Sequence, residues 1–280
     1  MGKCNTLTDY DSSARDYERL RRPSPATVQA LRAVFSSVPD EGVVLSLGCG
    51  TGHYEEALFH GRGVIGLDRS SAMLRMARAR VEHCVEGYIV RLPFADSIFE
   101  GVYFVQSLHH VGANLSINPS DRDELRKTAL AEAVRVLRKG PLAIVQRDSS
   151  QIEAVWFWKY FPAALATKLA IQPRIDAVMA WLSELGIEHL RATPVDDPMI
   201  ESFYDAESPL DVRFQRAFSE FGYLTHKQRS EGTKRLRAAI RSGRVADEIE
   251  TCRKRFAEIG GTVFVVSGIK PFARSAPAPA

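Results

Sequence analysis

The chain of 280 residues lacks a long uninterrupted hydrophobic run and has few cysteines. No apolar stretch is long enough to cross a bilayer, and the N-terminal residues do not form the apolar segment of a signal peptide. The cysteines show no spacing typical of a zinc site or of a disulfide framework, and they are Cys4, Cys49, Cys84 and Cys252. We therefore expect a cytoplasmic protein with reduced thiols, no metal site and no membrane partner.

The sequence also has no large excess of positive or negative charge. The formal net charge is +3, which does not by itself indicate nucleic acid binding. Basic residues gather between positions 234 and 244, where a solvated helix face is the usual explanation. With 45% hydrophobic residues, the chain can build one large α/β domain, with or without a lid. We expect a small-molecule partner, no nucleic acid partner, and a monomer or homodimer.

The sequence does contain an apolar run that breaks into alternating glycines. Residues 43–47 precede Gly48, Gly50 and Gly52, and a second apolar run ends at Asp68, twenty residues after Gly48. This order predicts a strand, a tight loop, a helix and a second strand, which together form a nucleotide-binding unit. The glycines leave room for a ligand against the backbone, and the helix offers unpaired N–H groups. A carboxylate at position 68 can accept hydrogen bonds from both ribose hydroxyls.

The spacing of the glycines separates two classes of ligand. A dinucleotide fingerprint requires glycine or alanine at position 53, where this chain has His53. The pattern G-x-G-x-G instead resembles the class I S-adenosylmethionine (SAM)-dependent methyltransferases, in particular their small-molecule type 11 group. Four further stretches resemble motifs of that family in the same order: Asp68, Arg91-Leu92-Pro93-Phe94, Ser107-Leu108-His109-His110-Val111, and residues 132–140.

The resemblance implies a Rossmann-like α/β fold with a mostly parallel seven-stranded sheet and helices on both faces. Apolar runs place its strands near 43–48, 63–68, 86–90, 101–106, 142–146, 190–195 and 262–269. Ligands of such sheets bind at the carboxyl ends of the strands. The resemblance therefore implies SAM as the cofactor, held by Gly48, Gly50, Gly52, Asp68, Tyr88, Gln106, Tyr17 and Arg21.

The last two of these residues belong to a predicted N-terminal extension, residues 1–38, with two helices separated by prolines. Its first helix resembles the family segment that folds over the methionine end of SAM. Tyr17 and Arg21 are one turn apart and face the same side. The arginine could bind the SAM carboxylate or an anionic substrate. Packing of the tyrosine on the sheet is the alternative.

Two positions depart from the family pattern, and each lacks a carboxylate. Ser46 stands where an acidic residue is usual, two positions before the first glycine, and Tyr88 is the counterpart of an acid that receives the adenine amino group. Each lost charge-assisted hydrogen bond could weaken cofactor binding by about 1–3 kcal/mol. A protein that holds SAM without methyl transfer is therefore one alternative function.

After the fifth predicted strand the chain is longer than a minimal methyltransferase. We predict a core at 39–196 and 260–272, an inserted helical lid at 197–259 that covers the substrate, and a flexible tail at 273–280. The aromatic cluster at 156–161 either packs in the core or lines a pocket for an apolar or aromatic substrate.

Methyl transfer is an in-line displacement, so alignment of donor and acceptor supplies most of the acceleration. His109 and His110, just past the fourth strand, are candidates for a base that deprotonates the acceptor. We predict SAM-dependent methylation of a small, apolar or aromatic metabolite. A tRNA-modifying methyltransferase is the second alternative function, because wobble-uridine enzymes resemble this chain in the N-terminal helix and the histidine pair.

Overall fold

The computed structural model describes residues 10–60, 63–198 and 201–272. Its centre is a seven-stranded sheet in the order β3-β2-β1-β4-β5-β7-β6. Strands β1 to β5 pair in parallel, and β7 runs antiparallel to both of its neighbours. The strands are β1 (Val44–Leu47), β2 (Val64–Asp68), β3 (His83–Glu86), β4 (Gly101–Val105), β5 (Gly140–Gln146), β6 (Glu188–Val195) and β7 (Val263–Lys270). The predicted mostly parallel sheet of seven strands is confirmed.

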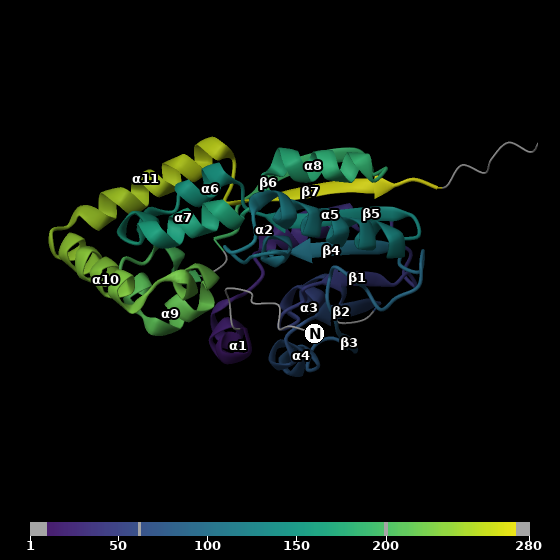
Figure 1. Cartoon of the computed structure of the whole chain (residues 1–280), viewed down its shortest axis with the longest axis horizontal. Helices are drawn as coiled ribbons and strands as arrows, with labels where there is room; N and C mark the ends of the chain where they lie inside the picture. Colours follow the sequence, from purple (N-terminus) through teal and green to yellow (C-terminus); the bar gives the residue numbers. More distant parts are fainter. Residues whose placement is uncertain (1–9, 61–62, 199–200, 273–280) are drawn as a thin grey trace, which may run out of the picture.

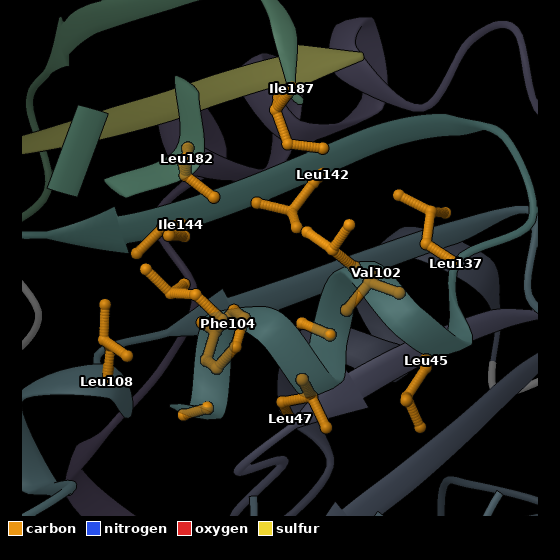
Figure 2. Packing of buried hydrophobic residues seen from close by; sticks show 14 of the residues in the cluster. Leu45, Leu47, Val102, Phe104, Leu108, Leu137, Leu142, Ile144, Leu182 and Ile187 are labelled. Atoms are coloured by element: carbon orange, nitrogen blue, oxygen red, sulfur yellow. The ribbon is translucent and has the colours of Figure 1, made fainter. Parts of the chain in front are cut away.

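Helices cover both faces of this sheet. On one face, α5 (Pro119–Val136) and α8 (Ile175–Glu184) pack on side chains of β1, β4 and β5, and Figure 2 shows this core around Phe104. On the other face lie α2 (Pro25–Val34), α3 (His53–Phe59) and the end of α4 (Ser71–Ala77). The central strands are mostly apolar because both of their faces are buried, and Ser46 of β1 and Gln146 of β5 are buried polar exceptions.

The third strand was misplaced by the sequence pattern. It spans His83–Glu86 and not 86–90. This strand lies at the edge of the sheet, where its residues are half-buried or exposed and need not be apolar. The apolar residues Ile89 and Val90 belong to the loop that follows, which a bridge between Tyr88 and Arg91 closes. Tyr88 therefore lies beyond the strand, in a loop at the carboxyl edge of the sheet.

A second group of helices lies beyond that edge (Figure 1). We call residues 149–171 and 201–259 the helical layer. The first segment contains α6 (Ser149–Glu153), η2 (Trp156–Tyr160) and α7 (Pro162–Ile171); the second contains η3 (Glu201–Tyr204), η4 (Ser208–Leu210), α9 (Val212–Ala217), η5 (Ser219–Tyr223), α10 (His226–Arg241) and α11 (Arg244–Ile259). Their buried side chains form one cluster, so a segment that the sequence pattern groups with the core packs with the insertion. In the described residues, no helix is long and apolar enough to cross a membrane.

The aromatic residues at 156–161 form the centre of this layer. Phe157 is fully buried, and its ring lies 5.6 Å from those of Phe214 and Phe218 and 6.1 Å from that of Phe221. Edge-on and offset contacts of this kind stabilise a core beyond the area they bury. Of the two interpretations of the cluster, packing is the one that these contacts favour.

Polar contacts connect the helical layer to the sheet domain. Arg122 and Arg126 of α5 donate hydrogen bonds to the carbonyls of Ala170 and Ile171, which end α7. The last carbonyls of a helix have no partner within it, so these arginines satisfy groups that would otherwise be costly to bury. The N-terminal helix α1 (Tyr10–Leu20) packs against α9 of the layer and against α4 of the sheet domain.

We predict that Phe157→Ala destabilises the protein by about 3–5 kcal/mol, because it leaves a cavity in a closely packed aromatic core. Urea unfolding followed by tryptophan fluorescence measures this loss. Val212→Ala is the control within the same layer, since Val212 is 53% exposed, and it should change stability by less than about 0.5 kcal/mol. A loss below about 1 kcal/mol for Phe157→Ala would show that the layer is not a packed core.

Candidate functional site

The glycine loop after β1 forms the floor of the site. Gly48 has a φ of +82°, and a Cβ there would lie 2.5 Å from the Cβ of Ser107, so a side chain fits neither the backbone conformation nor the space. Gly50 has a φ of +57°, and among the described residues a Cβ there would have only Tyr17 within 4 Å. The loop therefore passes close to β4 on one side and leaves open space on the other.

Asp68 ends β2 and holds this loop in place. Its Oδ2 accepts a hydrogen bond from the Gly50 N–H at 2.9 Å, and its Oδ1 accepts one from the Ser70 N–H at 2.9 Å. Burial raises the pKa of this carboxyl, while the two N–H donors oppose the rise. A carboxylate oxygen accepts more than one hydrogen bond, so Asp68 can bind a ligand hydroxyl and the loop together.

Most of the predicted cofactor residues surround one cleft at the carboxyl edge of the sheet. Its lining includes Tyr17, Gly48, Gly50, Asp68, Tyr88, Gln106 and His110, with Met73, Ile89, Val90, Val111 and Leu125 as apolar neighbours. A smaller cavity adjoins it, and Tyr17, Gly48, Val105 and Gln106 line both. The fold thus brings together residues that are more than a hundred positions apart in the sequence.

Three predicted residues lie outside the cleft. Gly52 is the N-cap of α3, with a φ of +84°. His109 is buried behind His110, with ring centroids 4.0 Å apart. Arg21 borders the smaller cavity, and two of its N–H groups donate to the Ala217 carbonyl at 3.1 and 2.9 Å. Its guanidinium also lies 4.6 Å from the ring centre of Phe218, so this arginine connects α1 to the helical layer.

The two histidines occupy an environment that disfavours a positive charge. Burial, followed by the nearby Lys168 ammonium, lowers the pKa of His110 to about 3. Burial and the neighbouring His110 lower the pKa of His109 well below its usual range. Both imidazoles are therefore neutral near pH 7, and His110 is a weak base.

The sequence pattern did not indicate the charged groups that lie behind His110. Lys168 of α7 and Glu220 of η5 form a buried ion pair, with 3.0 Å between Nζ and Oε1. Arg147, directly after β5, is also buried and donates to the Thr262 carbonyl at 3.2 Å. Charged residues in helices and loops usually face solvent, so only the apolar sequence around Lys168 hinted at its burial.

A carboxylate in the smaller cavity was missed as well. Glu55 of α3 is 1% exposed, and its Oε1 accepts a hydrogen bond from the Tyr103 hydroxyl at 2.9 Å. Glutamate in the first turn of a helix is common because the helix dipole favours it, so the sequence gave no reason to place this residue in a site.

Comparison with known proteins identifies the glycine-loop region. Residues 45–145 match the family described as "Methyltransferase domain". This chain carries a class I SAM-dependent methyltransferase domain. The match begins in β1 and ends in β5, so the methyltransferase domain includes the glycine loop, Asp68 and the histidine pair.

Individual relatives match mainly this methyltransferase domain. The O-methyltransferase resE of Aspergillus sclerotiorum is 33% identical over 107 residues, which are 35% of this chain and 36% of that protein. The tRNA (carboxymethyluridine(34)-5-O)-methyltransferase alkbh8 of Xenopus tropicalis is 28% identical over 111 residues, which are 40% of this chain and 16% of that protein. The chain thus spans about a third or less of the length of these two relatives.

The likeness to solved structures extends further along the chain. A crystal structure of a candidate methyltransferase from an antibiotic biosynthesis pathway of Anabaena variabilis is similar with a TM-score of 0.70 at 19% identity. The similarity covers 89% of this chain and 98% of that one. Most of the arrangement described here, beyond the methyltransferase domain alone, is therefore a known fold.

We predict that the protein loses stability as the pH falls from about 7.5 to about 5.5. The unfolded chain binds protons at His109 and His110 with a pKa near 6.5, whereas the folded chain does not, so the free energy of unfolding decreases by about 1.4 kcal/mol per histidine. Urea unfolding at the two pH values measures this change. His53 has a pKa lowered by burial and adds in the same direction.

The variant His110→Gln provides the control for this prediction. It removes one titrating group, so its stability should depend less on pH than that of the wild type. Glu220, whose pKa falls to about 2 beside Lys168, changes stability only at lower pH. Burial raises the pKa of Asp68 and Glu55, but both proteins contain these carboxyls, so their contribution cancels in the comparison. An equal pH dependence in both proteins would contradict a neutral, buried His110.

Proposed function

We propose that the protein transfers a methyl group from SAM to a small, apolar or aromatic metabolite. The observation that supports this function is the cleft that continues from the glycine loop and Asp68 to His110. Its two ends match two requirements, a nucleoside site at the carboxyl edge of the sheet and a neighbouring space for a methyl acceptor.

The residues of the cleft fit SAM. Open space beside Gly50 permits close approach of a ligand to the backbone, and Asp68 is placed to accept hydrogen bonds from ribose hydroxyls. The Nε2 of Gln106 is buried and has no hydrogen-bond partner among the described residues, although it belongs to the lining of the cleft. A buried donor without a partner is costly, and a polar ligand would satisfy it. When bound, SAM supplies an electrophilic methyl group.

The basicity of His110 restricts the class of acceptor. A base with a pKa of about 3 removes few protons near pH 7, so His110 would orient an acceptor by hydrogen bonding rather than deprotonate it. An acceptor that ionises readily, such as a phenol or a carboxylic acid, needs no stronger base. His109 would support the position of His110 from behind, through their ring contact.

We assign the lid function to the helical layer. Lys168 and Glu220 in this layer are near enough to His110 to affect its pKa, which supports a layer that approaches the acceptor end of the cleft. A cover at this position would exclude water from the reacting groups. An enclosed acceptor site suits a small molecule better than a tRNA.

The basic segment of α10 gives little support to the tRNA alternative. Arg235 donates to the Tyr160 carbonyl at 2.9 Å and is used inside the layer. Arg237 and Arg241 border a surface cavity that also contains Asp205, Glu207 and Asp211. Phosphate binding requires an uncompensated positive surface, and here the acidic residues reduce the local charge.

Calorimetric titration with SAM and with S-adenosylhomocysteine tests the cofactor site, with NAD as a control. We expect SAM and S-adenosylhomocysteine to bind and NAD not to bind. A labelled methyl donor offered with phenols, carboxylic acids and tRNA then tests the acceptor class. Transfer to tRNA alone would contradict the small-molecule proposal, and SAM binding without transfer to any acceptor would favour the non-methylating alternative.

We predict that Asp68→Ala weakens SAM binding roughly 10- to 100-fold, because it removes the ribose acceptor and releases the glycine loop from its hydrogen bond. Calorimetry measures the change in affinity. Asp176→Ala is the control, since Asp176 is exposed and pairs with Arg174 on the surface, and it should bind SAM as the wild type does. Unchanged affinity in Asp68→Ala would exclude a nucleoside at this strand end.

A further inference from the structure

A carboxylate is missing from strand β1 and present beside it. Ser46 occupies the position where the methyltransferase pattern has an acid, and it is buried in the centre of the sheet. The carboxyl of Glu55, in the first turn of α3, lies beside Ser46 and accepts a hydrogen bond from the Tyr103 hydroxyl at 2.9 Å. Helix α3 thus places the Glu55 carboxyl next to Ser46, whose own side chain has no carboxyl group.

The two oxygens of this carboxyl differ in their contacts. Oε1 of Glu55 accepts the Tyr103 hydrogen bond, whereas Oε2 is buried and has no hydrogen-bond partner among the described residues. Leaving a buried acceptor unsatisfied is costly, and more so when it is charged. Glu55 lines the smaller cavity, so a ligand in that cavity could supply the missing donor.

A donor without a partner borders the same cavity. Gln106 follows β4 with a φ of +51°, a left-handed conformation that is uncommon for a residue other than glycine. This strained backbone positions its side chain at the junction of the two cavities, where its Nε2 has no partner among the described residues. Backbone strain and unsatisfied polar atoms concentrate at binding sites.

The two unused groups are complementary to an α-amino acid. Its ammonium requires an acceptor such as Oε2 of Glu55, and its carboxylate requires donors such as Nε2 of Gln106. The smaller cavity joins the cleft that contains Asp68 through Tyr17, Gly48, Val105 and Gln106. A ligand with a nucleoside at one end and an amino acid at the other would therefore extend from Asp68 to Glu55.

We propose that Glu55 binds the ammonium group of the cofactor's amino acid end and replaces the carboxylate that Ser46 does not provide. This inference rests on the proposed function, because it requires SAM in the cleft. The cofactor site is then complete in this chain, although strand β1 has lost its acid. Burial raises the pKa of Glu55, and a bound ammonium would favour its ionised form.

A purely structural role for Glu55 predicts different behaviour. In that case the carboxylate only holds Tyr103 in the core, and its replacement would lower the stability and the affinity for every ligand alike. Two probes separate the possibilities: S-adenosylhomocysteine, which has the amino acid end, and 5′-methylthioadenosine, which lacks it. Calorimetry with both probes is performed on the full chain, and urea unfolding records the stability of each variant.

For Glu55→Gln we expect roughly 10- to 100-fold weaker binding of S-adenosylhomocysteine and less than about 2-fold change for 5′-methylthioadenosine. Equal losses for both probes, or no loss for either, would overturn the role of Glu55. Failure of the wild type to bind either probe would instead overturn the proposed function, so the two failures are distinguishable.

A second pair of variants tests the replacement directly. Glu55→Ala alone should lose affinity for S-adenosylhomocysteine. The double variant with Glu55→Ala and Ser46→Asp, which returns a carboxylate to β1, should bind S-adenosylhomocysteine at least tenfold more tightly than Glu55→Ala does. Should Glu55→Ala fail to fold, the conservative Glu55→Gln variant still decides the question. If the folded double variant binds S-adenosylhomocysteine no more tightly than Glu55→Ala, Glu55 does not replace a carboxylate at position 46.

Discussion

The structure depends on parallel strands that are buried on both faces. β1, β2, β4 and β5 run in the same direction, so their carboxyl ends meet at one edge and helices must cover the two faces. Helices bury the two faces of the sheet, whereas the loops at the carboxyl edge remain able to approach a ligand. Gly48, Asp68, Gln106 and the histidine pair all follow strands at this edge.

The helical layer is connected to the edge by buried polar groups. Arg122 and Arg126 of α5 make this connection by satisfying the carbonyls that end α7, whereas the ion pair between Lys168 and Glu220 joins α7 to η5 within the layer itself. A buried ion pair contributes little net stability, since desolvation offsets the attraction between its charges, but breaking one partner is costly. Such contacts therefore fix where the layer lies, while its aromatic core supplies the stability.

The same burial explains the chemistry that the site can perform. Desolvation keeps His110 neutral and weakly basic, which suits orientation of an acceptor more than proton removal. It also makes the unsatisfied atoms of Glu55 and Gln106 costly unless a ligand pairs with them.

The sequence by itself determined the central strands, the glycine loop and Asp68, because hydrophobic periodicity and backbone freedom at glycine are local properties. It placed Tyr88 in a strand when it lies in a loop, since an edge strand has no continuous apolar pattern. Only the tertiary structure decided that residues 149–171 pack with the helical layer, that Arg21 bonds to Ala217, and that Glu55 lies beside Ser46. These contacts join residues that are far apart in the sequence, so the local sequence around each residue cannot predict them.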